Sequence, residues 1–260
     1  MKVYGVDFTS APSRRKPITA AVGRIRRGRL VLKEVLRLPS FAEFESLLRD
    51  PGPWVGGFDF PFGLPRELVT DLGWPGTWPA LVAHCADLSR DQLRATFDAY
   101  RATRPAGRKY AHRATDLPAG SSSPMKLVNP PVALMFHEGA RRLAAAGVHV
   151  PGLAEGDRTR IALEAYPGFF ARSIVGRASY KSDTRAEHTR ERRDARRRIL
   201  AAMAVEAPPG LKKAMLEDGS GDTLDAAICA TQAAWGWARR ARRFGLPGGI
   251  DPCEGWIVGA

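Results

Sequence analysis

The residues best suited to chemistry are five carboxylates that lie at the ends of short apolar segments or at the start of a late helix. They are Asp7, Asp59, Glu164, Asp222 and Asp225. Hard divalent cations such as Mg²⁺ and Mn²⁺ prefer carboxylate oxygens, and a site with two such ions can hydrolyse a phosphodiester. We therefore expect these five residues to converge in one catalytic site that binds Mg²⁺ or Mn²⁺.

Three of the acids belong to segments with the pattern of buried strands. Short apolar runs that are stopped by proline or by polar turn residues are typical of such strands. Asp222 and Asp225 instead lie in the first turn of an Ala-rich helix expected over 222–243, where their spacing puts both on one face. The strand-like segments are KVYGVDF (2–8) with Asp7, WVGGFDF (54–60) with Asp59, and RIALEAYPG (160–168) with Glu164.

The remaining segments indicate an α/β fold. Two apolar runs between Ile18 and Leu38 flank the turn ArgArgGly and predict a hairpin, and Ser40 with Glu43 forms a capping box that predicts a helix over 40–50. The order is then β-β-β-α-β, an insertion, β and α. We expect one domain over 1–260 with a mixed sheet, in which three antiparallel strands precede parallel ones, and a mainly helical insertion over 65–130. The first and fourth strands are neighbours in such a sheet, which brings their terminal acids together.

Candidate substrate-binding residues are polar or basic and lie in several places. Two hydroxyls follow Asp7, where they could contact a phosphate or simply close the turn. A long polar loop over 104–131, between helices that begin after Ser89 and near Val132, is either a substrate-gripping or a disordered segment. An Arg-rich helix over 184–200 is either a phosphate-binding or a solvated face. The candidates are Thr9, Ser10, Arg108, Lys109, His112, Arg113, Lys181, Arg192, Arg193 and Arg196.

The charge balance favours a polyanionic partner. Forty Lys and Arg side chains against twenty-seven Asp and Glu give a formal net charge of +13. Such an excess attracts nucleic acid, although a biased composition that only maintains solubility is the alternative. No apolar run approaches the roughly 20 residues of a membrane-spanning helix, and the N-terminus has no signal-peptide pattern. We expect a cytoplasmic protein with no membrane partner and with three reduced cysteines; the sequence does not indicate the oligomeric state.

Four short motifs carry a resemblance to a known family. GVDFTSAP, FDFPFGLP, EAYPG and GDTLDAAICA resemble, in order and spacing, predicted RNase H-like nucleases catalogued as a bacterial and archaeal domain of unknown function. The late helix is also similar to that of RuvC-type resolvases. The resemblance implies an RNase H-like fold in which Asp7 bridges the metals, Asp59 is a ligand and one or both of Asp222 and Asp225 complete the site. Glu164 would be a ligand or would instead hydrogen-bond a group that lies behind the ligands.

Other interpretations of the same residues remain open. Asp222 and Asp225 could cap the late helix, Asp7 could form an Asx-turn, and Asp59 or Glu164 could cap the helix that follows. GVDFTS also resembles the first phosphate loop of the actin-like and sugar-kinase superfamily, which implies an ATP-dependent phosphotransferase or ATPase. A third hypothesis is a nucleic-acid-binding protein without catalysis.

Overall fold

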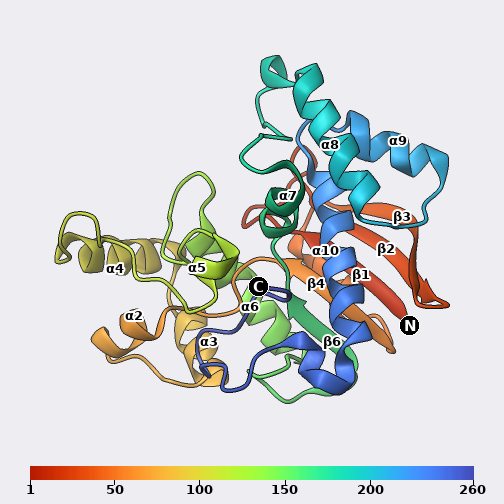
Figure 1. Cartoon of the computed structure of the whole chain (residues 1–260). Coiled ribbons are helices and arrows are strands. Elements are labelled where there is room, and N and C mark those ends of the chain that lie inside the picture. The colour runs from red at the N-terminus through yellow and green to blue at the C-terminus, as the bar shows by residue number, and fades with distance from the viewer.

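One mixed sheet of six strands organises the molecule (Figure 1), which a computed structural model describes over residues 1–260. The strands are β1 (Lys2–Asp7), β2 (Ile18–Arg26), β3 (Arg29–Leu38), β4 (Trp54–Asp59), β5 (Val148–His149) and β6 (Asp157–Glu164). The helices are α1 (Phe41–Leu48), α2 (Arg66–Asp71), α3 (Trp78–Asp87), α4 (Arg90–Ala102), α5 (Asp116–Ala119), α6 (Val132–Ala146), α7 (Pro167–Val175), α8 (Arg190–Ala202), α9 (Pro209–Glu217) and α10 (Asp222–Ala238). Two 3₁₀ helices are η1 (Arg185–Glu187) and η2 (Arg240–Gly245).

The strand order is β3-β2-β1-β4-β6-β5. Strands β1 to β3 are antiparallel neighbours, whereas β4 pairs in parallel with both β1 and β6, and β5 is parallel to β6. The predicted sheet of three antiparallel strands followed by parallel ones is therefore confirmed. Strand β5 has no counterpart in the prediction, because two residues are too few to display a periodic pattern.

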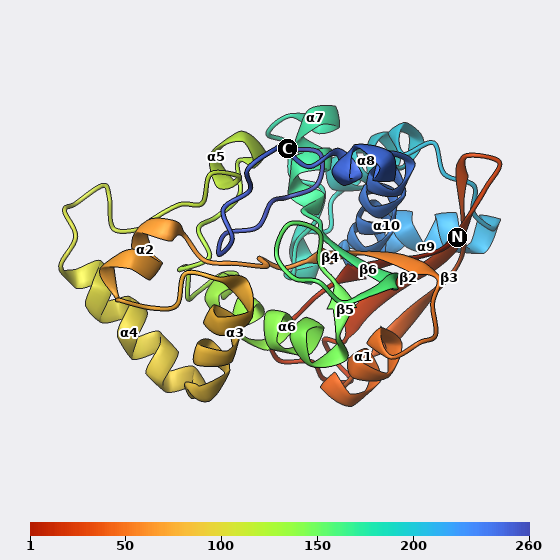
Figure 2. The same cartoon turned by 90° about the horizontal axis from the view of Figure 1, so that it is seen from below.

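Helices cover both faces of the sheet (Figures 1 and 2). Helix α10 packs on one face with α7, α8 and α9 beyond it, whereas α1 and α6 lie on the other face, where α3 packs against α6 and α4 lies beyond α3. Helix α5 lies on the same side of the sheet as α7, whose Arg172 donates a hydrogen bond to the Ala119 carbonyl of α5. Alternation along the strands divides the side chains between two cores: Val3 and Val55 pack toward α10, and Tyr4 and Phe58 toward α6. None of the helices has both the length and the apolar character that a bilayer span requires.

Local signals in the sequence place several helix ends correctly. Ser40 with Glu43 forms the expected capping box before α1, and Ser89 with Gln92 forms the same motif before α4. Helix α6 stops at Gly147, whose φ of 64° is a left-handed conformation that glycine adopts without strain.

Two helix boundaries differ from the prediction. Helix α8 begins at Arg190 rather than at 184, because the Thr189 side chain caps its first turn by accepting from the Arg192 N–H. Helix α10 ends at Ala238, and the chain then turns into η2 with Arg243 and Phe244 at positive φ. Arginine has a high helix propensity, so a prediction based on composition made both helices too long.

The segment 104–131 is an ordered part of the fold. It contains α5, and Ala111, Arg113, Met125 and Leu127 are buried within it. The insertion as a whole shares a core with the sheet, because Trp78 and Phe97 pack in the same apolar cluster as β-strand residues. A disordered loop, one of the two predictions for this segment, is therefore wrong.

Candidate functional site

Asp7 and Asp59 are direct neighbours on adjacent parallel strands. They form the last register pair between β1 and β4, so both carboxylates leave the carboxyl end of the sheet on the same face. That face is the one covered by α10. The convergence expected from strand order is thus present at the first two acids of the chain.

Two glycines let α10 approach the strands that carry these acids. A Cβ at Gly5 would overlap the main chain at Ala226 and Ala230, and a Cβ at Gly57 would overlap the Cys229 carbonyl. Because each glycine lies two residues before an acid, it faces the same side of the sheet as that acid. The backbone of α10 therefore lies directly on the strands, and its first turn reaches the two carboxylates.

Asp225 is the innermost acid of α10. Its side chain is fully buried and accepts hydrogen bonds from the Tyr180 hydroxyl, at 2.6 Å, and from the Lys181 ammonium. Tyr180 and Lys181 belong to the segment between α7 and α8, so this segment supplies both side chains that hydrogen-bond the Asp225 carboxylate. A cation and a hydroxyl beside a buried carboxylate lower the cost of its burial.

Asp222 does not cap α10. The free N–H of Thr223 donates instead to Asp218, at 2.9 Å, and the Thr223 hydroxyl donates to the same carboxylate oxygen at 2.7 Å. The residue at the N-cap position is Gly221, which makes no side-chain cap. Asp218 thus performs the capping role that Asp222 and Asp225 could have had, and Asp222 faces the adjoining pocket.

Burial, together with the neighbouring acids, raises the pKa values of Asp7 and Asp59. Burial and then the charge of Asp225 raise the pKa of Asp7 well above its usual range, with further contributions from Asp222 and Asp59, while Lys181 opposes the shift. Burial likewise raises the pKa of Asp59 to about 7 against the effect of Lys181. Neither Asp7 nor Asp59 gains stabilisation from a hydrogen bond. Ionised carboxylates crowded in this way require either protons or a cation.

Without a metal, the protein is expected to lose stability as pH rises. The folded-state pKa of Asp59, about 7, exceeds its ordinary value of 3.8. Between these two pH values the folded state therefore keeps a proton on Asp59 that the unfolded state has released. The contribution of Asp59 to stability is full below about pH 4, falls by about 1.4 kcal/mol per pH unit, and is lost above about pH 7. Urea unfolding from pH 4 to 8 in a chelator should show this slope, and Asp59→Asn should reduce it. The exposed control Asp87→Asn should retain it; equal slopes in all three proteins would contradict the raised pKa.

A pocket of about 770 Å³ opens beside the acid cluster. Asp7, Asp59 and Asp222 line it together with two lysines, Lys16 and Lys181. Thr9 and Ser10 also line it, as predicted for substrate-binding candidates, although the Thr9 hydroxyl also accepts from the Ala11 N–H at 3.4 Å and so closes the turn. The pocket has the size of a ligand site, and the acids Asp7, Asp59 and Asp222 are grouped in one part of its wall.

The chemistry of the donor set fits a hard divalent cation. Asp7 and Asp59 have carboxylate oxygens that no protein group binds, and Asp222 adds a third carboxylate at the pocket wall. As they stand, no three of the acid, histidine and cysteine side chains form a complete set of metal ligands. The cation that the structure does place among the acids is the ammonium of Lys181.

The acid site lies within the part of the chain that a family model covers. The model described as Protein of unknown function (DUF429) matches residues 5–245, from β1 to η2. The chain belongs to this family. No curated protein and no solved structure matches the chain. The family description names no activity, so the chemistry of the site has to be argued from its residues.

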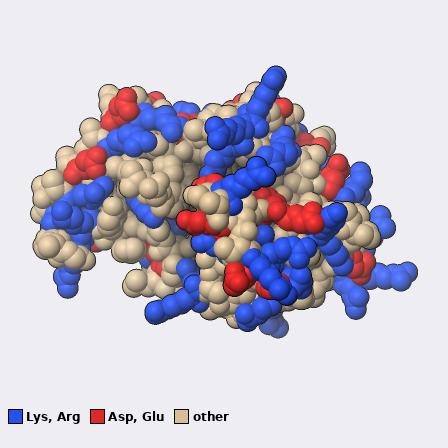
Figure 3. All heavy atoms as spheres, turned by 90° about the horizontal axis from the view of Figure 1, so that it is seen from above, with Lys and Arg blue, Asp and Glu red and all other residues tan.

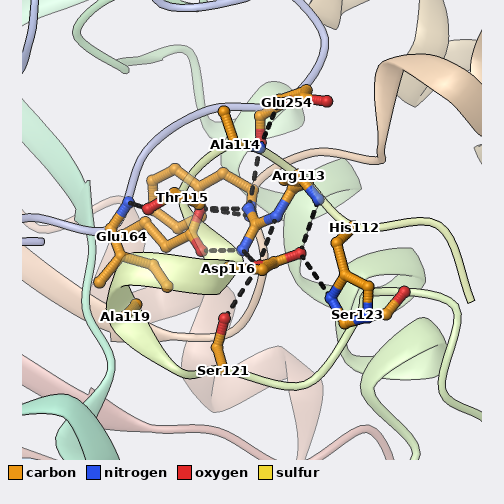
Figure 4. Close-up of polar contacts among 12 residues, drawn as sticks. His112, Arg113, Ala114, Thr115, Asp116, Ala119, Ser121, Ser123, Glu164 and Glu254 are labelled. Atoms are coloured by element: carbon orange, nitrogen blue, oxygen red, sulfur yellow. Dashed lines mark hydrogen bonds and ion pairs between the residues drawn. The ribbon is translucent and has the colours of Figure 1, made fainter.

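Glu164 belongs to a buried ion-pair network beside the cluster of Asp7, Asp59, Asp222 and Asp225 (Figure 4). Its carboxylate accepts from Arg113 at 2.7 and 2.8 Å and from the Phe62 N–H at 2.9 Å. The sequence left three roles open for Glu164, as a metal ligand, as a hydrogen-bond partner or as a helix cap; it does not cap α7, and this geometry makes it an anchor at the pocket wall. All three hydrogen bonds favour the ionised form, although burial raises its pKa.

Arg113 is not the exposed phosphate-binding residue that the sequence predicted. Its Nε and Nη atoms make five hydrogen bonds, to Asp116, Glu164 and the Glu254 carbonyl (Figure 4). A guanidinium has five N–H donors, so none remains for a substrate. The physical reason is burial: a charge inside the fold has to be fully paired.

The other candidates of the same loop lie away from the acids. Arg108 and Lys109 are exposed beyond the end of α4 and do not line the pocket. His112 is also exposed and lies 4.0 Å from Asp116, outside the pocket lining. The structure therefore does not bring these three residues to the acid site.

Two of the three candidate arginines of α8 bind other groups of the protein. Arg196 is buried and donates to the carbonyls of Leu216, at 2.9 Å, and Tyr180, at 2.6 Å, so its predicted contact with substrate is wrong. Arg192 pairs with Glu187 at 2.8 Å. Arg193 is half-buried and makes no ion pair. None of the three lines the pocket.

Sequence reasoning missed Tyr180, Asp218, and the basic run of Arg14, Arg15 and Lys16. Tyr180 has no signal in the sequence, because its partner Asp225 is 45 positions away. Asp218 is followed by GlySerGly and then a helix start, which is a capping signal that the acids of the helix itself obscured. The basic run begins two residues after the first motif, and the place of Lys16 at the pocket beside the acids could have been inferred from that.

Proposed function

We propose that this protein is a divalent-metal-dependent phosphodiesterase that hydrolyses nucleic acid, built on an RNase H-like form of its mixed α/β fold. The observation that carries the proposal is the pairing of Asp7 with Asp59 beneath Asp222 and Asp225 of α10, at the base of a pocket. Carboxylates from two neighbouring strands and a later helix, with no binding partners for two of them, fit a cation site better than a structural role.

Asp7, Asp59 and Asp222 would hold Mg²⁺ or Mn²⁺, with Asp225 as a further ligand once it is free of Lys181. Such ions polarise a phosphodiester and activate water. Side chains of the protein would bind and orient the substrate. Lys16 and Lys181, on the pocket wall, attract the negative phosphates, and Thr9 and Ser10 offer hydroxyls for hydrogen bonds beside Asp7.

The surface charge supports a nucleic acid as substrate. The net charge is +13, and Lys and Arg side chains are distributed over much of the face in Figure 3, interspersed with Asp and Glu. A diffuse positive field of this kind accelerates the encounter with a polyanion but reads no sequence.

The test is a cleavage screen over single-stranded, duplex, hybrid and junction DNA and RNA with Mg²⁺ or Mn²⁺, run beside an ATP-hydrolysis assay. We expect cleavage that a chelator abolishes and that Asp59→Asn eliminates. ATP turnover without cleavage would instead support a phosphotransferase. Tight, salt-sensitive binding with neither activity would support a non-catalytic binding protein.

Arg14 and Arg15 are expected to contribute more to nucleic-acid binding than Arg26 and Arg27, which are exposed at the other end of the strands. Both are exposed on the loop after β1 and have no ion-pair partner, and their neighbour Lys16 lines the pocket. The double variant Arg14→Ala/Arg15→Ala should weaken binding and lower the slope of log affinity against log salt by roughly 2, about one unit for each phosphate that is no longer neutralised.

The matched control is Arg26→Ala/Arg27→Ala, which removes the same charge from the β2–β3 turn at the opposite end of the strands. Fluorescence anisotropy with a labelled oligonucleotide over a salt series measures both variants. Equal losses of affinity in the two variants would show that only net charge matters.

A further inference from the structure

Hydrogen bonds of the main chain at residues 180–182 fix the position of Lys181 beside the acid cluster. The Tyr180 carbonyl accepts from buried Arg196 at 2.6 Å, the Lys181 carbonyl accepts from the Ser179 hydroxyl at 3.0 Å, and the Ser182 N–H donates to the Gly219 carbonyl at 3.0 Å. These bonds fix the residues on both sides of Lys181. The fold therefore directs the Lys181 side chain toward Asp225.

Gly221 leaves room for the Lys181 side chain. Its φ is +83°, and a Cβ at this position would lie 2.7 Å from Lys181 Cβ and 3.0 Å from Cδ. The aliphatic part of Lys181 thus rests on the turn that starts α10, and the ammonium reaches the Asp225 carboxylate. Less than half of the side chain, 43%, is exposed, on the side of the pocket.

We propose that Lys181 is a built-in counter-cation that occupies Asp225 in the metal-free protein and is displaced when a divalent cation binds. The inference rests on the proposed metal site and assigns its regulation. An ammonium and a metal ion compete for the same carboxylate, so Lys181 lowers the metal affinity of the site. After displacement, the ammonium remains on the pocket wall, where it can pair with a substrate phosphate.

Coupling between substrate and metal follows from this competition. A phosphate that binds Lys181 removes the competitor from Asp225 and so favours metal binding, and by linkage the metal favours phosphate binding to the same degree. The opposite role is a Lys181 that permanently positions Asp225 as a ligand. In that case its loss would weaken metal binding, so the two roles predict effects of opposite sign.

The experiment titrates Mn²⁺ into the full-length protein without nucleic acid and follows free Mn²⁺ by electron paramagnetic resonance. Lys181→Met keeps the aliphatic stem and removes the charge, and it should bind Mn²⁺ about tenfold more tightly than the parent, because one charge-assisted hydrogen bond no longer has to be broken. Lys181→Arg, which retains a cation, should stay near the parent.

Lys16→Met is the matched control, since it removes the same charge from the pocket rim but from an exposed pair with Asp183. Lys16 hydrogen-bonds none of the four acids and affects the pKa of Asp222 less than burial, Asp218 or Asp225 do, so at 0.15 M salt the Mn²⁺ affinity of Lys16→Met should change by less than about twofold. Equal gains of affinity in the Lys16 and Lys181 variants would overturn the proposal in favour of a general field effect. Weaker binding by Lys181→Met would also overturn it.

Thermal melts provide a second measurement. Without metal, Lys181→Met should melt below the parent, because Asp225 keeps a buried charge with only Tyr180 as partner, and Mn²⁺ should raise its melting temperature more than that of the parent. If the parent binds Mn²⁺ and Lys181→Met binds it with the same affinity, the role of Lys181 is overturned but the metal site is not. Absence of Mn²⁺ binding in every folded variant would overturn the metal site and the proposed function with it.

Discussion

Asp7→Asn is expected to abolish cleavage while leaving the metal-free protein at least as stable as the parent. Asparagine keeps the shape of the side chain and removes a carboxylate whose ionisation is opposed by burial and by Asp225, Asp222 and Asp59. Loss of a central ligand should lower the cleavage rate by at least about a hundredfold, as expected for removal of a major electrostatic contribution. The rise in melting temperature that Mg²⁺ or Mn²⁺ gives the parent should also disappear.

Asp50→Asn is the matched control, because Asp50 lies near the other end of β1 and is a structural acid. Its carboxylate accepts from Lys2 at 2.8 Å and from the Tyr4 hydroxyl at 2.9 Å, and these bonds lower its pKa. This variant should be destabilised with or without metal and should retain the metal-induced shift. If Asp7→Asn behaves in the same way in thermal melts over a metal titration, Asp7 is a turn residue and the proposed site is wrong.

Arg113→Met is expected to lower the free energy of unfolding by about 3–5 kcal/mol, the usual cost of leaving a buried charge unpaired. Removal of the guanidinium leaves Glu164 and Asp116 facing each other in the interior, and it also frees the Glu254 carbonyl. The network joins the 104–131 segment, the end of β6 and the C-terminal segment, so its loss should also open the pocket wall. Urea unfolding at pH 7 measures the effect.

Arg108→Met, an exposed arginine of the same segment, is the control and should change stability by no more than about 0.5 kcal/mol. The double variant Arg113→Met/Glu164→Gln should recover part of the lost stability, because a neutral amide no longer requires a cation. A destabilisation by Arg113→Met as small as that of the control would mean that the network contributes no net stability.

Sequence alone located the acids of β1 and β4 because the information there is local. A strand ends where its apolar pattern ends, so Asp7 and Asp59 are visible as terminal residues in the printed sequence. The order of elements then makes the two strands neighbours, and the register pair follows. The capping boxes of α1 and α4 are local in the same sense, since each partner lies three residues away.

Tertiary structure decided which charged residues remain free to act. Arg113 and Arg196 lie in the same basic segments as Arg108 and Arg192, yet the first two are buried and the others are not fully covered. Asp116, one partner of Arg113, lies three residues away, but the other carboxylate partner, Glu164, is 51 positions away, and no periodic pattern encodes such a pair. Packing of the 104–131 segment against the end of β6 brings Arg113 and Glu164 together, and burial then forces every donor to be used.

The same distinction separates the two halves of the acid site. Strand pattern and element order predict that Asp7, Asp59 and the first turn of α10 meet. That Lys181 and Tyr180 hold Asp225 depends on how the segment between α7 and α8 folds over the helix, 44 and 45 positions from it in sequence. Periodicity specifies which face of an element is buried, whereas the partner across that face is specified only by three-dimensional packing.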